Sequence, residues 1–375
     1  GLLYGGTENG LFVSFDDGDN WQSLQQNLPQ VPITDLYVQQ DDLVVSTQGR
    51  SLWILDDLTP LQQLFDDAPE GDIALLKPRD PVRNISNGYP DAGPGKNPPD
   101  GLQVHYLLPE ETDTPIQFDI VDDSGNVIYT DRSDLEGTIC GRGQAEIPRP
   151  ETISANVGDN LWQWRLQTGE FECLPEIYSV SGSMDAYTAA PGDYTVRMTV
   201  GDVVQEQPFR IRVDPRLGGD TPENLQKYAE MDALSASLMT AASAMSQGVK
   251  DLRLVKKQLA LINELNPSDA VTEKAAELDA SVDAWIELIL QKELKTFQHV
   301  YQHEGRLLMK IKDLLGRMHG SDIPLTDGFK DVTGDYLDVW SDYNDRLARI
   351  RIDEIAAFNE VAEAAGASTI KILDE

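Results

Sequence analysis

Short apolar runs that alternate with turn residues fill the beginning of the chain. The runs "LLYGGT" and "GLFVSF" flank Asn9-Gly10, a dipeptide typical of tight hairpin turns. Three similar runs, "ITDLYVQ", "LVVSTQG" and "RSLWILDD", follow. Residues 2–21 and 42–61 share one design, in which a strand and a turn lead to an aromatic-bearing strand that ends in Asp-Asp. The pattern predicts short antiparallel strands that repeat.

The spacing of this repeat favours one β architecture. Copies roughly forty residues apart, each with room for four short strands, are typical of β-propeller blades. Two blades cannot close a ring and would leave strand edges unpaired. We therefore expect residues 1–60 to be the last blades of an incomplete propeller. The remaining blades, in the same precursor or on a separate chain, would be their partners.

Residues 61–215 show a different β pattern. A linker rich in Pro, Gly and Asp, "KPRDPVRNISNGYPDAGPGKNPPDG", precedes the strand-like runs "LQVHYLLP" and "PIQFDIVDDSGNVIYT". Apolar and polar residues alternate again in "GDYTVRMTVGDVVQEQPFRIRV". A region of this length built from alternating strands predicts an immunoglobulin-like β-sandwich. The stretch 133–180 is longer than a sandwich connection needs, so we expect it to be an insertion.

Helical periodicity governs residues 216–375. Thr221 before Pro222 is a typical helix start, and Asn266-Pro267 separates this helix from the next. The first helix carries one apolar stripe with steps mostly of three and four: Met231, Leu234, Leu238, Ala241, Met245, Leu252, Val255, Leu259 and Ile262. A third helix is expected at residues 294–320, and a fourth between Thr326 and Gly366. The fold class is thus multidomain β plus α, ending in an antiparallel helical bundle.

The charge balance excludes some classes of partner. Thirty Lys and Arg against 64 Asp and Glu give a formal net charge of −34. Such a surface repels nucleic acids and anionic membranes. No uninterrupted apolar run reaches the length of a membrane span, so the chain is not expected to cross a bilayer. The acidity serves solubility or, alternatively, weak surface binding of Ca²⁺, and the absence of an EF-hand loop favours solubility. No other cofactor is expected.

Cysteine usage and the first residues bear on localisation. Cys140 and Cys173 are the two cysteines, and neither belongs to a C-x-x-C pair. A disulfide between them would contribute about 3–4 kcal/mol in the chain-entropy model and suits an oxidising compartment. The chain opens "GLLYGG", with neither a starting Met nor a signal-like segment. We therefore expect an interior portion of a longer protein that is secreted, periplasmic or on the cell surface.

One motif invites a functional label. Within "SFDDGDNW", the residues Ser14, Asp16, Gly18 and Trp21 fit the S-x-D-x-G-x-x-W pattern of the Asp-box or BNR repeat. The hydroxyl and carboxylate can bond backbone groups in a tight turn, Gly18 can take a positive φ, and Trp21 can cover the turn. Nothing near Asp16 supplies a second positioned acid. The motif therefore predicts a structural turn, and we assign no catalytic residue.

The insertion and its surroundings hold the candidate binding residues. Five aromatic residues could form a sugar-stacking or protein-binding surface: Trp162, Trp164, Phe171, Tyr178 and Tyr187. Trp162 and Trp164 also share one strand face, which favours the alternative that they belong to a core. His299 and His303 lie four apart, a spacing that can bind metal, but lack the HExxH order, so we expect no metal site.

The order of these segments resembles a known family. The segment "GRSLWILDDLTPL", followed by "PGDYTVRMTVGDVVQEQPFRIRVDPR" and helices, is similar to the C-terminal region of large secreted bacterial proteins. Those proteins carry BNR or sortilin-type β-propellers of the WD40/YVTN/BNR-like kind and are often catalogued as glycosyl hydrolases. A sialidase-like site would need an arginine cluster, an acid and a nucleophilic tyrosine. No residue here can be matched to them, so the resemblance transfers no catalytic role.

Two functions follow as expectations. The first is a non-catalytic C-terminal scaffold and protein- or glycan-binding portion of a secreted BNR-type propeller protein. The alternative is an accessory region of a glycoside hydrolase whose active site lies in propeller blades missing from this chain.

Overall fold

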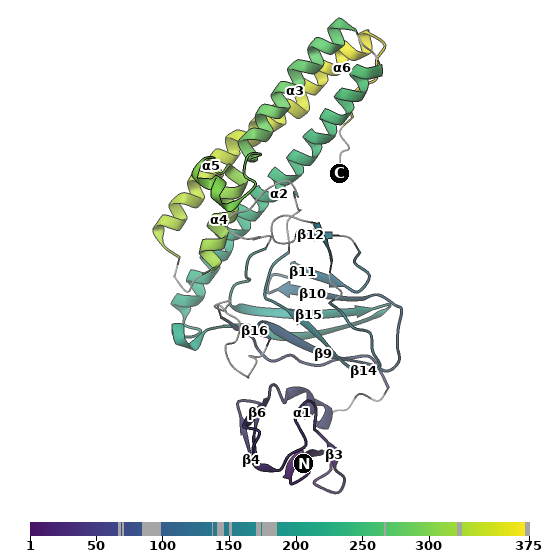
Figure 1. The fold of residues 1–375 in the computed structure, drawn as a ribbon, viewed down its shortest axis with the longest axis vertical. Coiled ribbons are helices and arrows are strands. Elements are labelled where there is room, and N and C mark those ends of the chain that lie inside the picture. Colours follow the sequence, from purple (N-terminus) through teal and green to yellow (C-terminus); the bar gives the residue numbers. More distant parts are fainter. Residues whose placement is uncertain are drawn as a thin grey trace. The chain divides into compact units, whose positions relative to one another are not determined.

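The chain divides into two compact units. The computed structural model describes all residues except 67–68, 70, 85–98, 137, 141–145, 150–151, 170–173, 175–185, 266–267, 321–324 and 372–375. Unit 1 comprises residues 1–135, 150–166 and 191–219, and unit 2 comprises residues 136–149, 167–190 and 220–375. Parts of the predicted insertion 133–180 thus cluster with the helices, although the sequence suggested an addition to the strand region. Mixed β and α structure, with helices toward the C-terminus, is evident in Figure 1.

Two small sheets form the beginning of unit 1. Each has three antiparallel strands: β1 (Leu3–Thr7), β2 (Gly10–Ser14) and β3 (Gln22–Ser23) in one, and β4 (Ile33–Gln39), β5 (Asp42–Thr47) and β6 (Leu52–Leu55) in the other. Leu11 and Val13 of the first sheet and Leu43 and Val45 of the second are buried in one shared core. At the β1–β2 turn, Gly10 has a φ of 125°, which glycine adopts without strain.

A short helix follows the last strand of the second sheet. Helix α1 (Thr59–Asp66) follows β6 directly. Oδ1 of Asp57 accepts hydrogen bonds from the backbone N–H and the hydroxyl of Thr59, at 3.0 and 2.7 Å. Because Asp57 offers an acceptor to the first turn, the chain enters a helix at this point.

The rest of unit 1 contains a sheet of five strands and one of three. The order in the first is β11-β10-β15-β16-β8, and in the second β14-β9-β7. Their bounds are β7 (Ala74–Leu75), β8 (Val82–Arg83), β9 (Leu102–Leu108), β10 (Ile116–Asp122), β11 (Val127–Arg132), β14 (Gly158–Trp164), β15 (Gly192–Val200) and β16 (Val203–Val213). A short 3₁₀ turn, η2 (Pro215–Leu217), follows β16. The sheets curl in the manner of half a barrel (Figure 1).

Aromatic rings join these two sheets. Phe118 of β10 stacks on Trp162 of β14, with ring centroids 4.4 Å apart and planes at 5°. Trp164 of β14 and Phe209 of β16 form a T-shaped pair with ring centroids 6.2 Å apart. Since each pair takes one ring from each sheet, the sheets face each other across a single core.

Unit 2 is mainly helical. Its elements are the hairpin β12 (Thr138–Cys140) and β13 (Glu146–Pro148), then α2 (Pro222–Leu265), α3 (Asp269–Ile289), η3 (Phe297–Tyr301), α4 (Leu307–His319), α5 (Asp327–Arg349), the π-helical turn η4 (Ile350–Glu354) and α6 (Ile355–Ala364). Helix α2 begins as predicted, because the Thr221 hydroxyl accepts from the N–H of Asn224 at 3.2 Å. The predicted apolar stripe of α2 is buried except for Leu234, which is partly buried.

The predicted third helix at 294–320 was wrong in its first half. The structure has a short 3₁₀ turn, η3, and the α-helix begins only at Leu307. Nδ1 of His299 lies 2.8 Å from the carbonyl oxygen of Glu293 and 3.3 Å from the backbone nitrogen of Lys295. It donates to the first or accepts from the second, according to its tautomer, and in either case the side chain binds a backbone group. Gly305 then interrupts the run just before α4.

A membrane-spanning helix is defined by its length and its apolarity. Among the described residues, no helix combines the length and the apolar character that crossing a bilayer requires.

Candidate functional site

The Asp-box turn closes on itself. The Ser14 hydroxyl donates to Oδ1 of Asp16 at 2.9 Å and accepts from the N–H of Gly18 at 2.9 Å. The same Oδ1 accepts from the N–H of Asn20 at 2.8 Å, and Oδ2 from the side chain of Asn20 at 2.7 Å. Gly18 has a φ of 95°, and its carbonyl accepts from the indole of Trp21 at 3.0 Å. The predicted structural roles of all four motif residues are present.

These contacts decide what Asp16 can do chemically. Hydrogen bonds from the side chain and backbone of Asn20, and then from Ser14, lower the pKa of Asp16. A general acid in glycoside hydrolysis needs the opposite, a carboxyl that keeps its proton near neutral pH. Asp16 is therefore an acceptor that holds the turn together.

The outer face of the β4–β5–β6 sheet carries exposed apolar side chains. Tyr37, Val44 and Ile54 are direct neighbours in the strand register, and Leu52 lies beside them on β6. Tyr37 is 63% exposed, Leu52 69% and Ile54 58%. The inner face of the same sheet is the core described above. Strands that are apolar on both faces, such as "LWIL" in β6, are typical of a sheet covered on both sides. We name Tyr37, Val44, Leu52 and Ile54 the outer sheet face.

A small group of charged side chains lies at one edge of this sheet. Oδ1 of Asp42 accepts from Arg79 at 2.7 Å and from the N–H of Asp57 at 3.0 Å. Partial desolvation and then the charge of Asp42 raise the pKa of Asp56, which Arg79 opposes. Sequence spacing does not reveal this group, because Asp42, Asp56 and Arg79 are far apart along the chain. Asp42 binds the backbone N–H of Asp57 and the guanidinium of Arg79, which is a structural role.

Trp162 and Trp164 belong to the core, so the binding-surface interpretation does not hold for them. They are 0% and 1% exposed, and their rings make the intersheet contacts. Tyr187 is 8% exposed within unit 2, and burial raises the pKa of its hydroxyl above the ordinary value, with a further contribution from Asp232. Period-two spacing had indicated the buried alternative for the tryptophans.

Other predicted residues lie outside the described part. Phe171, Tyr178 and Cys173 are not among the described residues. Cys140 ends strand β12, but its side chain is not described, so the predicted disulfide stays a prediction.

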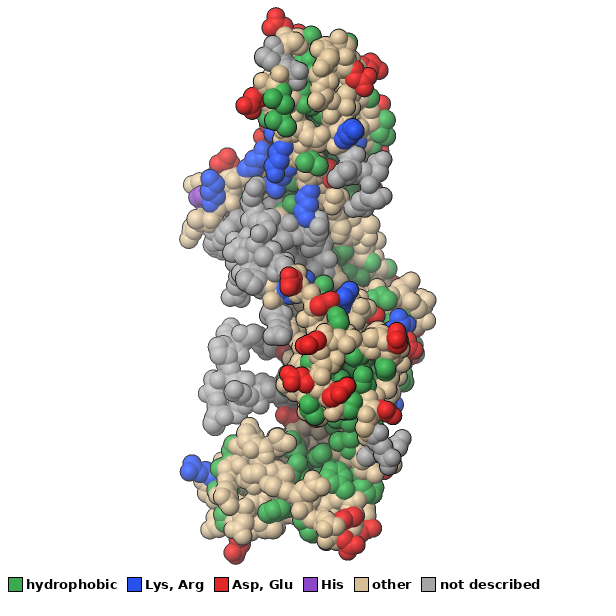
Figure 2. All heavy atoms as spheres, turned by 90° about the vertical axis from the view of Figure 1, so that its right-hand side faces the viewer, with side chains coloured by type: hydrophobic (Ala, Val, Ile, Leu, Met, Phe, Trp, Pro, Cys, Tyr) green, Lys and Arg blue, Asp and Glu red, His purple; other side chains and the backbone are tan. Residues whose placement is uncertain are grey.

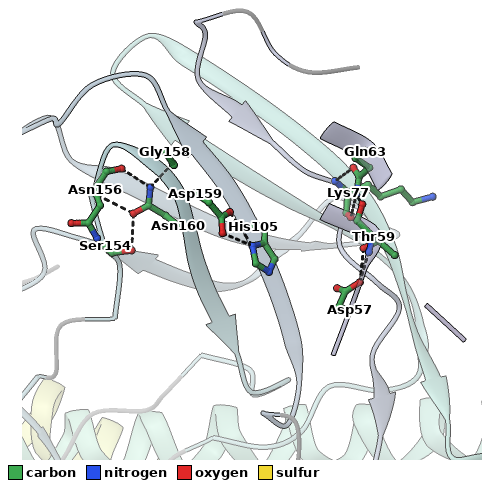
Figure 3. A network of polar contacts seen from close by, with 10 residues as sticks. All are labelled: Asp57, Thr59, Gln63, Lys77, His105, Ser154, Asn156, Gly158, Asp159 and Asn160. Atoms are coloured by element: carbon green, nitrogen blue, oxygen red, sulfur yellow. Dashed lines mark hydrogen bonds and ion pairs between the residues drawn. The ribbon is translucent and has the colours of Figure 1, made fainter. Parts of the chain in front are cut away.

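Figure 3 shows the polar contacts around strands β9 and β14. The Asn160 side chain accepts from Ser154 and from the N–H of Asn156, and donates to the carbonyls of Asn156 and Gly158, so it closes the turn before β14. Nδ1 of His105 lies 3.0 Å from Oδ1 of Asp159 on the adjacent strand. Within the part of the chain that the structure describes, no Ser, Thr or Cys side chain bonds His105, so the pair lacks the nucleophile of a hydrolase triad.

A buried histidine of unit 2 was missed by sequence reasoning. Nε2 of His319 lies 2.7 Å from the Ser235 hydroxyl, and the centroid of its ring is 5.5 Å from that of Tyr187. The Ser235 hydroxyl also lies 2.8 Å from the carbonyl of Met231 in its own helix. This pair therefore fixes α4 against α2.

Unit 2 also contains a cavity and a pair of neighbouring histidines. A cavity of about 320 Å³ lies between α4 and α5, with Phe329, Val332 and Tyr336 among its lining residues. Its cations Lys310 and Arg317 are paired with Glu304 and Asp313. The rings of His299 and His303 are 6.1 Å apart. Over the described ranges, no three His, Cys, Asp or Glu side chains come together as metal ligands.

Comparison with known proteins adds no family. No protein-family model, no curated protein and no solved structure matches this chain.

Proposed function

We propose that this chain is the non-catalytic C-terminal scaffold and protein- or glycan-binding portion of a secreted BNR-type propeller protein. In this proposal residues 1–60 are the last propeller blades, residues 61–215 an immunoglobulin-like sandwich and residues 216–375 a supporting bundle. The remaining blades, in the same precursor or on another chain, cover the outer sheet face. Secretion and the propeller identity rest on the sequence resemblance.

The observation that carries the proposal is the outer sheet face. Tyr37, Leu52 and Ile54 expose apolar surface on a sheet whose other face is already a core. Leaving such side chains in water costs on the order of 1.5–3 kcal/mol for each, compared with full burial. A second apolar sheet face fits this surface, since packed sheets bury side chains from both.

Dye binding tests the exposed face. The hydrophobic dye ANS should bind the isolated chain, and Leu52→Lys with Ile54→Lys should reduce its fluorescence while the melting temperature stays within about 2 °C, because the substitutions change exposed positions. The matched control is Val204→Lys on β16, also an exposed apolar position. Equal fluorescence of the wild type, the double variant and the control would contradict the proposed docking face.

Hydrolysis distinguishes the alternative function. A scaffold should release no sugar from chromogenic sialosides or other glycosides, whether assayed as this chain or as the longer protein that contains it. Cleavage by the longer protein alone would favour the alternative, an accessory region of a glycoside hydrolase with its active site in other blades. The closed hydrogen bonding of Asp16 supports the first outcome.

A further inference from the structure

Helix α2 carries a second apolar stripe that faces solvent. Leu254, Leu261 and Leu265 are 41%, 56% and 66% exposed, whereas their neighbours Val255, Leu259 and Ile262 are buried in the bundle core. Residues 254, 258, 261 and 265 follow steps of four, three and four, which is the a/d spacing of a coiled coil. We call Leu254, Gln258, Leu261 and Leu265 the outer seam.

Charged side chains flank this outer seam on one side only. Lys257 and Glu264 are exposed and lie immediately before Gln258 and Leu265, at the g positions of the heptad. Neither makes an ion pair or hydrogen bond within the described chain. The other side is closed, because the Gln258 side chain exchanges two hydrogen bonds, of 2.9 and 3.0 Å, with the backbone of Lys371. Basic side chains and exposed hydrophobic ones lie near each other over the helical region in Figure 2.

We propose that the outer seam binds the same seam of a second copy of this chain, with the two α2 helices antiparallel. In that register Leu254 meets Leu265 of the second copy, and Gln258 meets its Leu261. By the two-fold symmetry each contact occurs twice, as in an isologous interface.

Charge complementarity selects this occupant and this orientation. Leu254 and Leu261 are d positions of the heptad, and Gln258 and Leu265 are a positions. In an antiparallel pair each a position packs against a d position of the other helix, and the g positions of the two helices then face each other. Lys257 then faces Glu264 of the second copy, and Glu264 faces its Lys257, so both flanking contacts join opposite charges. In a parallel pair, by contrast, each of these g residues would face a core-directed position such as Val255 or Ile262. Two copies of the outer seam are therefore complementary in charge only when their α2 helices run antiparallel.

The length of the outer seam sets the strength of this contact. Residues 254 to 265 span about 16 Å of helix, which is shorter than most stable dimer interfaces. The net charge of −34 on each copy also opposes association. We therefore expect a weak dimer, with a dissociation constant on the order of 0.1 mM at roughly physiological salt.

Sedimentation equilibrium of the chain, at concentrations up to several times that dissociation constant, tests the pairing. Leu261→Asp should raise the dissociation constant about tenfold or more, because it places a charge in the centre of the contact. Val339→Asp, at an exposed apolar position of α5, is the matched control and should leave it unchanged. Leu52→Lys should also leave it unchanged, which separates this contact from the outer sheet face.

A charge exchange gives the sharper result. Lys257→Glu and Glu264→Lys should each weaken the dimer, because each variant places like charges at positions 257 and 264 of the two copies. By the two-fold symmetry this repulsion occurs at both ends of the contact. The double variant Lys257→Glu with Glu264→Lys should restore the wild-type dissociation constant, because it regenerates both opposite-charge contacts. Circular dichroism verifies that every variant keeps its helices. A chain that stays monomeric, a Leu261→Asp variant that dimerises like the wild type, or a double variant that is not restored would overturn the proposal.

Discussion

The indole N–H of Trp162 donates a hydrogen bond of 2.9 Å to Oδ2 of Asp131, and both side chains are buried. The hydroxyl of Thr152 donates to the same oxygen at 2.6 Å, and the backbone N–H of Arg132 donates to Oδ1 at 3.0 Å. Both carboxylate oxygens thus have partners inside the protein. The bond joins β14 of the three-stranded sheet to β11 of the five-stranded sheet, so Trp162 holds the two sheets together.

Replacing Trp162 by Phe should destabilise unit 1 without affecting any ligand. The phenyl ring keeps most of the stacking on Phe118, but a buried carboxylate oxygen loses one of its donors. We expect the free energy of unfolding to fall by about 1–3 kcal/mol, measured by chemical denaturation. Leu161→Ala, at an exposed position of the same strand, should change it by less than about 0.5 kcal/mol. Loss of glycan binding at unchanged stability would instead restore the binding-surface interpretation.

Asp16→Ala should open the Asp-box turn. The backbone N–H of Asn20 loses the carboxylate oxygen that accepts its hydrogen bond. The Ser14 hydroxyl, which accepts from the N–H of Gly18, loses the carboxylate oxygen to which it donates. Hydrogen exchange at the amides of Gly18 and Asn20 should accelerate, while exchange in α2 stays the same.

Acid should reproduce the effect of Asp16→Ala in the wild-type protein. The folded-state pKa of Asp16 is lowered from its ordinary value of 3.8, so its contribution to stability is complete above that value and is lost as the pH falls through the folded pKa. Exchange measured across this pH range, corrected for intrinsic rates, should show the wild type approaching the variant. A turn whose protection is the same in the variant and the wild type would contradict the role of Asp16.

Features that depend on residues close together in the sequence could be predicted from it. The Asp-box, the Gly10 turn, the Thr221 cap and the α2 stripe each depend on residues within a few positions of one another, and each was predictable. The prediction of a continuous helix at 294–320 was wrong in its first half. There the His299 side chain binds a backbone group, and hydrophobic periodicity does not predict such a contact. The pairing of Trp162 with Asp131, like that of Arg79 with Asp42, joins residues 31 or more positions apart, so only the fold brings them together.

Asp56→Asn should stabilise the sheet of β4, β5 and β6 at neutral pH. Desolvation and the neighbouring charge of Asp42 raise the pKa of Asp56 in the folded protein, so ionising this carboxyl costs stability at every pH above the folded pKa. Below the ordinary pKa of 3.8 the group is protonated in both folded and unfolded states, and the cost disappears. The melting temperature of the variant should therefore exceed that of the wild type at pH 7 and match it near pH 3.

A control separates this local effect from the loss of one negative charge. Asp41→Asn removes a charge from the adjacent turn, where the backbone φ of 66° suits asparagine equally well. If Asp41→Asn raised the melting temperature as much as Asp56→Asn, general charge repulsion in this acidic chain would be the cause, and the specific role of Asp56 would be refuted.

At Gly248, helix α2 packs tightly against side chains of α3 and α5. A Cβ atom at this position of α2 would lie 2.8 Å from Cη2 of Trp285 on α3 and 2.8 Å from Cδ2 of Leu347 on α5. The indole of Trp285 cannot retreat freely, because its N–H donates to the carbonyl of Tyr343 at 2.7 Å. Gly248→Ala should therefore lower the free energy of unfolding by about 1–3 kcal/mol through overpacking, although alanine is the better helix former by about 1 kcal/mol.

Gly334→Ala provides the matched control for that substitution. Gly334 lies within α5, and a Cβ there would meet no atom within 4 Å, so alanine should act through helix propensity alone and stabilise by about 0.5–1 kcal/mol. The opposite signs of these two Gly→Ala changes, measured by urea denaturation, test the packing directly. Leu347→Ala removes one of the two obstacles, so adding Gly248→Ala to it should cost less than adding Gly248→Ala to the wild type. Equal costs in both backgrounds would mean that Leu347 does not press on position 248.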